Sequence, residues 1–145
     1  SFRYPVKMID GDYSPQLFFD MAKGKEHIPE GGERCFLCYE MRLKETARLA
    51  KELQYEYFCT TLSVSPHKNA VKLNELGAKY SKEYDIPYLY SDFKKRNGYK
   101  RSIELSHEYG LYRQNYCGCV YSRMQTELKE QEKNFQNEMK TVVKP

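Results

Sequence analysis

Apolar side chains recur at helical spacing along much of the chain and predict a series of helices. The clearest pattern lies within residues 36–53, where one face carries Leu43, Ala47, Ala50 and Leu53. Ser14 followed by Pro15 is typical of a helix start, and Gly110 is typical of a helix end. The predicted helices span 15–24, 36–53, 69–84, 102–110 and a last segment that follows residue 124 and ends near 140.

Three short segments between these helices are rich in aromatic and β-branched residues and predict strands. They cover residues 4–10, 55–62 and 86–92. Strands that alternate with helices over short connections are typical of a parallel sheet with crossover helices, so the predicted fold class is α/β. We expect one α/β domain over residues 1–124 and a charged helical extension over 125–145.

The composition excludes several classes of protein. The 145 residues are enough for one domain with a core, and 14 Tyr and 7 Phe argue against disorder despite a mean hydropathy of −0.84. No apolar run is long enough for a membrane span, and no signal-peptide pattern is visible. The net charge of +4 permits a polyanionic partner without requiring one. We therefore expect a cytoplasmic protein with reduced cysteines and neither a membrane nor a DNA partner.

Four of the five cysteines form two close pairs, and these pairs are the main candidates for chemistry. Cys35 and Cys38 form a Cys-x-x-Cys motif at a helix start, where the thiolate is favoured. Cys117 and Cys119 flank a glycine, a spacing that opposes a relaxed disulfide between them but presents two sulfurs together. The pattern favours structural zinc or an iron–sulfur cluster, while redox exchange and plain structural cysteines stay open. Cys59, within a predicted strand, is interpreted as a buried apolar residue.

Two loops supply candidate contacts to an anionic substrate. The segment 93–101 has five basic residues among nine, and Phe93 and Tyr99 lie between them, which suits phosphate contacts and base stacking but also a solvated loop. The loop 60–69 lies between a strand end and a helix start, where hydroxyls and amides bind phosphates or simply cap the helix. The candidate side chains in and near these loops are Thr60, Thr61, Ser65, His67, Lys94, Arg96, Arg101 and Arg113.

Three blocks of sequence, in this order, resemble the epoxyqueuosine reductase family of the QueH type, which does not depend on cobalamin. The blocks are GERCFLCYEMRLKETARLAKEL, YFCTTLSVSPHKN and DFKKRNGYKRSIELSHEYGLYRQNYCGCVYS, and with the earlier GDY they place the resemblance over roughly residues 4–124. The resemblance implies a three-layer Rossmann-like sheet of the kind found in adenine-nucleotide hydrolases. It also implies reduction of epoxyqueuosine to queuosine at the wobble position of tRNA, the last step of queuosine biosynthesis. The alternative is a zinc-stapled RNA-binding module without redox chemistry.

The resemblance assigns a role to the four paired cysteines, and the implied reaction suggests roles for the other candidates. Cys35, Cys38, Cys117 and Cys119 would hold a [4Fe–4S] cluster, with an additional iron as a further cofactor candidate, and an electron donor of unknown identity would supply it. Candidate proton donors or oxygen-orienting groups are Tyr39, His67, Tyr112 and Arg113, while Thr60, Thr61, Ser65, Lys94, Arg96 and Arg101 would contact tRNA. The family's N-terminal Cys-Cys-x-Pro-Cys motif does not occur in these residues, and the sequence does not begin with Met. We therefore expect the natural protein to start upstream, and these cysteines to be part of a larger ligand set.

Overall fold

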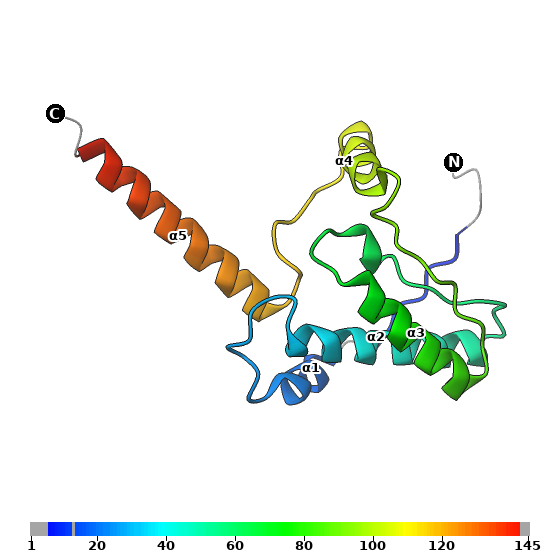
Figure 1. Cartoon of the computed structure of the whole chain (residues 1–145). Helices are drawn as coiled ribbons and strands as arrows, with labels where there is room; N and C mark the ends of the chain where they lie inside the picture. The colour runs from blue at the N-terminus through cyan, green and yellow to red at the C-terminus, as the bar shows by residue number, and fades with distance from the viewer. Residues whose placement is uncertain (1–5, 13, 143–145) are drawn as a thin grey trace.

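The computed structural model describes residues 6–12 and 14–142, and helices dominate this part of the chain (Figure 1). The predicted helices are all present, with ends shifted by a few residues. The helices are α1 (Pro15–Ala22), α2 (Glu33–Glu52), the 3₁₀ turn η1 (Leu62–Val64), α3 (Ala70–Tyr84), α4 (Gly98–Glu108) and α5 (Val120–Val142).

Local sequence signals account for several of the helix ends. Pro15 occupies the first turn of α1, as predicted, although Ser14 makes no side-chain capping hydrogen bond. Asn69 caps α3, because its Oδ1 accepts a hydrogen bond of 3.0 Å from the Lys72 amide. Gly110 follows α4 with φ of +61°, the left-handed conformation that glycine adopts without strain.

The core lies where α2 packs against α3 (Figure 1). The apolar face predicted for residues 36–53 supplies one side of this contact, although Leu53 lies past the end of α2 and is exposed. Tyr88 covers α3 from the following segment, directly over Gly77, which leaves room for its ring. The buried core comprises Cys35, Tyr39, Leu43, Ala47, Ala50, Phe58, Leu73, Leu76, Tyr80, Ile86 and Tyr88.

The predicted strands form only one parallel bridge in the described residues, between Phe58 and Tyr88. The Phe58 amide donates to the Pro87 carbonyl (3.1 Å), and the Leu89 amide donates to the Phe58 carbonyl (2.9 Å). Since α3 connects the two segments, the parallel pairing with a helical crossover is confirmed at this point. Full strands over 55–62 and 86–92 do not form in the described residues, which show this one bridge and no extended sheet.

The physical reason for the missing sheet is the lack of neighbours beside this pair. Tyr57, Leu89 and Tyr90 flank the bridge and are exposed, so no further segment covers them in the described part of the chain. Two paired strands are marginally stable on their own, and further strands beside them add stability. Residues 6–10 of the predicted first strand form no strand, and residues 4 and 5 lie outside the described residues.

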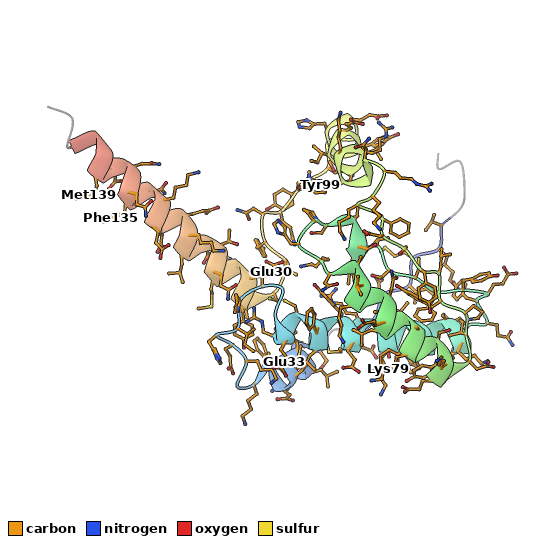
Figure 2. All side chains as sticks on the ribbon, viewed as in Figure 1. Glu30, Glu33, Lys79, Tyr99, Phe135 and Met139 are labelled. Atoms are coloured by element: carbon orange, nitrogen blue, oxygen red, sulfur yellow. The ribbon has the colours of Figure 1, made fainter. Side chains whose placement is uncertain are left out.

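Helix α5 extends away from the α2–α3 core and carries exposed apolar side chains, among them Phe135 and Met139 (Figures 1 and 2). It begins before the predicted domain boundary at residue 124 and continues beyond it. Among the described residues, no helix has the length and apolar character that crossing a membrane requires.

Candidate functional site

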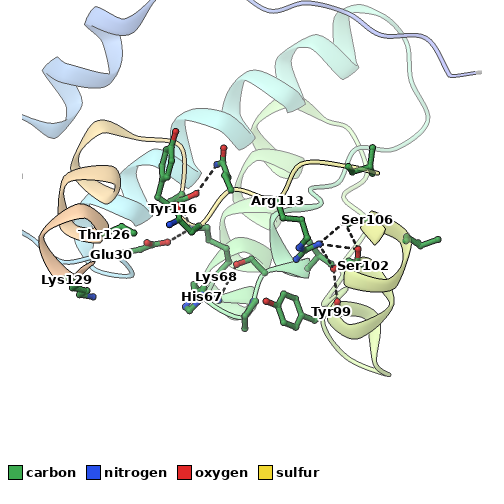
Figure 3. Close-up of a pocket in the computed structure, with 18 residues that line it drawn as sticks. Glu30, His67, Lys68, Tyr99, Ser102, Ser106, Arg113, Tyr116, Thr126 and Lys129 are labelled. Atoms are coloured by element: carbon green, nitrogen blue, oxygen red, sulfur yellow. Dashed lines mark hydrogen bonds and ion pairs between the residues drawn. The ribbon is translucent and has the colours of Figure 1, made fainter. Parts of the chain in front are cut away.

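A cavity of about 880 Å³ opens between the loop that precedes α3, helix α4, the segment that joins α4 to α5, and the start of α5 (Figure 3). Its wall combines apolar and polar surface, and several of the lining side chains are cationic. Among the lining residues are Glu30, Ser65, His67, Lys68, Tyr99, Ser102, Ser106, Arg113, Tyr116, Cys117, Thr126 and Lys129.

A hydrogen-bonded ring of four residues lies at one side of this cavity, and three of them line it. The buried Lys68, with only 6% of its side chain exposed, donates to Cys117 Sγ (2.8 Å) and to Glu30 Oε1 (2.7 Å). Ser122 Oγ donates to Glu30 Oε2 (3.0 Å) and accepts from the Cys117 amide (2.9 Å). The ring therefore joins three segments that are far apart in sequence: the loop before α2, the loop before α3 and the start of α5.

The charges in this ring support one another. Burial opposes the charge of Lys68, but the hydrogen bonds to Cys117 and Glu30 outweigh it and raise the pKa of Lys68 above its usual value. Burial also opposes the charge of Glu30, and the same ammonium outweighs it and lowers the Glu30 pKa. For Cys117, burial dominates and raises the pKa of the thiol, while Lys68 acts in the opposite direction. The ring thus combines a cation, a carboxylate and a sulfur atom.

Cys35, the first member of the other cysteine pair, lies at the start of α2 near the same ring. Cys35 is buried there and its Sγ accepts from the Gly31 amide (3.3 Å), while Cys38 is half-buried one turn further on. The Tyr39 hydroxyl lies within electrostatic reach of Cys35, Cys117 and Lys68. Burial is the main reason why the pKa of Tyr39 rises to about 12, and its hydroxyl has no hydrogen-bond partner in the described structure. Cys35 and Cys117, one cysteine from each pair, therefore lie near the same Tyr39 hydroxyl.

The Cys-Gly-Cys segment turns sharply before α5. Gly118 adopts φ of +88°, a conformation that opposes any residue with a side chain. Cys119 Sγ accepts from the Ser122 amide (3.3 Å), so three of the four paired sulfurs, those of Cys35, Cys117 and Cys119, accept an N–H hydrogen bond. Such donors stabilise anionic sulfur, and they also surround thiolate ligands of metals.

Thiolates such as those of the four cysteines are the usual ligands of an iron–sulfur cluster, whereas the positions of these cysteines do not form a closed metal site in the described residues. All five cysteines are free. Within residues 6–12 and 14–142, no three His, Cys, Asp or Glu side chains gather closely enough to hold a metal ion. The sulfurs therefore suit the cluster by their chemical type and N–H donors, but their positions in the described residues do not form the site.

Arg34 also connects the two cysteine segments. Its buried guanidinium donates to the carbonyls of Lys25 (3.2 Å), Glu26 (2.7 Å) and Ile28 (2.6 Å), and so shapes the loop before α2. Its central carbon lies 4.9 Å from the centre of the Tyr121 ring, two residues beyond Cys119. One side chain thus orders the loop that carries Glu30 and contacts the start of α5.

The structure brings some of the predicted substrate contacts to the cavity. Ser65, His67 and Arg113 line it together with Cys117. Arg113 donates to Ser106 Oγ (3.0 Å) and to the Ser102 carbonyl (3.1 Å), so α4 orients its guanidinium (Figure 3). Ser65 and His67 come from the loop before α3, whereas Arg113 and Cys117 come from the segment between α4 and α5, so two segments far apart in sequence meet at this cavity.

Other predicted contacts lie away from the cavity lining. Tyr112 is 85% exposed and lines a smaller neighbouring cavity, and Thr60 accepts a hydrogen bond from the Leu62 amide at the start of η1, next to the exposed Thr61. Two of the three basic residues chosen in segment 93–101 are already paired. Lys94 contacts Asp92 and donates to the Lys68 carbonyl, and Arg101 contacts Glu104, whereas Arg96 is exposed. Cys59 is half-buried beside Tyr88 rather than fully buried.

The sequence interpretation missed Glu30, Lys68 and Ser122. Lys68 lies in a polar loop, where lysine is usually exposed, so its burial was not predictable from pattern alone. Its one available signal was its place beside Asn69, the cap of α3, within a block already singled out. Glu30 precedes two glycines, and Ser122 lies three residues after Cys119, a spacing that suits an N–H···S contact.

Comparisons with known proteins all point to one family, and they cover most of the chain. The sequence model of the family described as "Epoxyqueuosine reductase QueH" matches residues 2–125. Curated relatives of the same name include proteins from Streptococcus pyogenes (48% identical over 117 residues), Staphylococcus aureus (50% over 122) and Thermotoga maritima (34% over 125). These alignments cover 81%, 83% and 84% of this chain and 46%, 51% and 65% of the respective relative. The chain thus spans about half the length of the first two.

Proposed function

The chain belongs to the epoxyqueuosine reductase QueH family, and from this premise we propose that it takes part in the reduction of epoxyqueuosine to queuosine in tRNA. The substrate would be the modified wobble base, which is unpaired in the anticodon loop and so accessible to a protein cavity. The cavity beside Cys117 is the observation that carries the proposal. It places a sulfur ligand candidate next to cationic and hydroxyl side chains that suit a nucleotide.

We propose that Cys35, Cys38, Cys117 and Cys119 supply ligands to a [4Fe–4S] cluster, with an additional iron as a further candidate. Such a group would supply electrons one at a time and a Lewis-acidic iron. The N–H groups that face three of these sulfurs favour the anionic ligand form.

The reaction itself requires two electrons and two protons for each epoxide, and it yields a carbon–carbon double bond and water. A donor of unidentified nature would supply the electrons. Arg113 is held by α4 with its guanidinium in the cavity wall, where it would orient the epoxide oxygen or a phosphate. His67 would provide a proton at the same wall, and the exposed Tyr112 is a further candidate to donate a proton or to orient the epoxide oxygen.

The proposed contacts to tRNA extend from the cavity to the surrounding surface. Ser65 lies in the wall, and Thr60 and Thr61 lie at the start of η1. In the basic segment, exposed Arg96 is the best placed for a phosphate, while Arg101 and Lys94 would have to exchange their carboxylate partners for one.

We also propose that the Phe58–Tyr88 pair belongs to a Rossmann-like parallel sheet, within an α/β domain over residues 1–124 that α5 extends. The parallel bridge with α3 as its crossover supports this arrangement, as do the exposed side chains of Tyr57, Leu89 and Tyr90. Hydrogen exchange would test it in a protein of the relatives' full length. Amides of 55–60 and 86–91 should be strongly protected there, and rapid exchange would contradict the sheet.

Metal analysis tests the proposed cofactor. Anaerobic reconstitution with iron and sulfide should give a brown protein with broad absorbance near roughly 400 nm. Cys117→Ser should lower the iron content, because it removes one ligand candidate, while Cys59→Ser should leave it unchanged as the matched control. A colourless protein that binds a single zinc and no iron would contradict the proposal and favour a zinc-stapled RNA-binding module.

A further inference from the structure

We propose that Lys68 is a positioning residue that holds the Cys117 sulfur in place for ligand binding. No sequence motif assigned this residue a role, and it is buried, cationic and in direct contact with Cys117. The role proposed for Lys68 rests on the proposed function, whereas the hydrogen bond from Lys68 to Cys117 Sγ is independent of it. Lysine is rarely buried unless it is paired, so a buried lysine that faces a sulfur atom requires an explanation.

Both ends of Lys68 are fixed, which makes the direction of its bond to sulfur specific. Its amide donates to the Ser65 carbonyl (3.2 Å), and its own carbonyl accepts from Lys94 Nζ (3.2 Å). Its ammonium is held by Glu30 at 2.7 Å. With the backbone and the charged end both held, the N–H that points to Cys117 Sγ has little freedom to move.

The same carboxylate that holds Lys68 also holds the segment that carries Cys117. Glu30 Oε2 accepts from Ser122 Oγ, and Ser122 Oγ accepts from the Cys117 amide. Glu30 therefore fixes the lysine and the cysteine relative to each other. Lys68 and Ser122 are almost inaccessible to solvent, so this arrangement differs from a surface ion pair.

The arrangement suits a sulfur that binds metal as an anion. The charge-assisted N–H···S bond comes from a fixed donor, which prevents the Cys117 side chain from turning away from its ligand position. Lys68 would therefore act on the cluster through Cys117, without contact to the substrate.

The test compares the reactivity of single cysteines in the folded, reduced, metal-free full chain. Iodoacetamide would label the protein, and mass spectrometry of peptides would give the rate for Cys117 relative to Cys119. Lys68→Met keeps the volume but removes the donor, so the Cys117/Cys119 ratio should fall about tenfold. Lys68→Arg keeps a cationic donor and should retain the ratio within about threefold.

A double variant separates positioning from folding. Lys68→Met alone leaves Glu30 without its cation, which destabilises the fold. Glu30→Gln/Lys68→Met removes both charges and should recover the melting temperature, while the Cys117 ratio stays low. An unchanged or increased ratio in Lys68→Met, or a ratio restored in the double variant, would overturn the inference.

Failure of the proposed function gives a different result. If the reconstituted wild-type protein contains no iron, the cluster assignment fails, yet the labelling ratio still decides whether Lys68 controls Cys117. If the wild-type protein contains iron and Lys68→Met labels like wild type, the role of Lys68 fails and the cluster assignment stands.

Discussion

Ser122 is the most informative residue for testing whether the two cysteine segments are joined as described. Its side chain is 2% exposed, and its hydroxyl makes two hydrogen bonds that link the Cys117 amide to Glu30 Oε2. Ser122→Ala removes both bonds, and water cannot readily replace the hydroxyl at a buried position. A bond to a charged acceptor contributes about 1.5–3 kcal/mol and one between neutral groups about 0.5–1.5 kcal/mol, and the two are not fully additive. We expect the free energy of unfolding to fall by about 2–3 kcal/mol.

Urea unfolding of the reduced, metal-free protein, followed by circular dichroism, measures this loss. With a slope near 2 kcal/mol per M, the midpoint should shift downward by about 1–1.5 M without a change in slope. Thr46→Ala is the matched control, because its hydroxyl donates only to the Arg42 carbonyl on the exposed face of α2 (2.8 Å). That variant should stay within about 0.5 kcal/mol of wild type. If Ser122→Ala costs no more than Thr46→Ala, the hydrogen-bonded ring does not join these segments.

Two further predictions concern the α2–α3 core and its surface. Gly77→Ala would place a methyl carbon 2.3 Å from the ring of the buried Tyr88. This overpacking should lower the free energy of unfolding, measured in urea, by about 1–3 kcal/mol, although alanine has the better helix propensity. Adding Tyr88→Leu to the same chain should recover part of the lost stability. Hydrogen bonds from Lys79 and Tyr80 lower the pKa of Glu40 below its ordinary value near 4.5. The interactions of the Glu40 carboxylate therefore stabilise the fold fully above pH 4.5, and this stabilisation is lost as the pH falls through the lowered pKa. In thermal unfolding, the Glu40→Gln variant should lose less stability than wild type over this pH window. Parallel pH profiles of the two proteins would contradict this prediction.

The helices could be predicted from sequence because their signals are local. The apolar face of residues 36–53, the Pro15 start and the Asn69 cap each lie within one or two turns of the element that they define. The strands could not be predicted with the same success, because a strand depends on its neighbours in space. Phe58 and Tyr88 pair, but the side chains beside them have no covering segment in the described part of the chain.

The candidate site likewise contains residues that the sequence could reveal and residues that only the tertiary fold brings together. The spacing of Cys117 and Cys119 singled out the sulfurs, and the structure places Cys117 in the wall of the cavity. The residues that hold this sulfur come from the loop before α2 and the loop before α3, so only the tertiary fold brings Glu30 and Lys68 to it. In the basic segment, charge alone could not reveal that Lys94 is already paired with Asp92.

Conversion of the modified base itself tests the central claim most directly. The chain, reconstituted anaerobically with iron and sulfide, would be incubated with a chemical reductant and tRNA that carries epoxyqueuosine, both alone and within a protein of the relatives' full length. Mass spectrometry of the digested nucleosides should show queuosine, which has one oxygen atom fewer, formed in an iron-dependent reaction that Cys117→Ser abolishes. If the iron-loaded full-length protein leaves epoxyqueuosine unchanged, or if Cys117→Ser converts it as fast as wild type, the proposed function is contradicted.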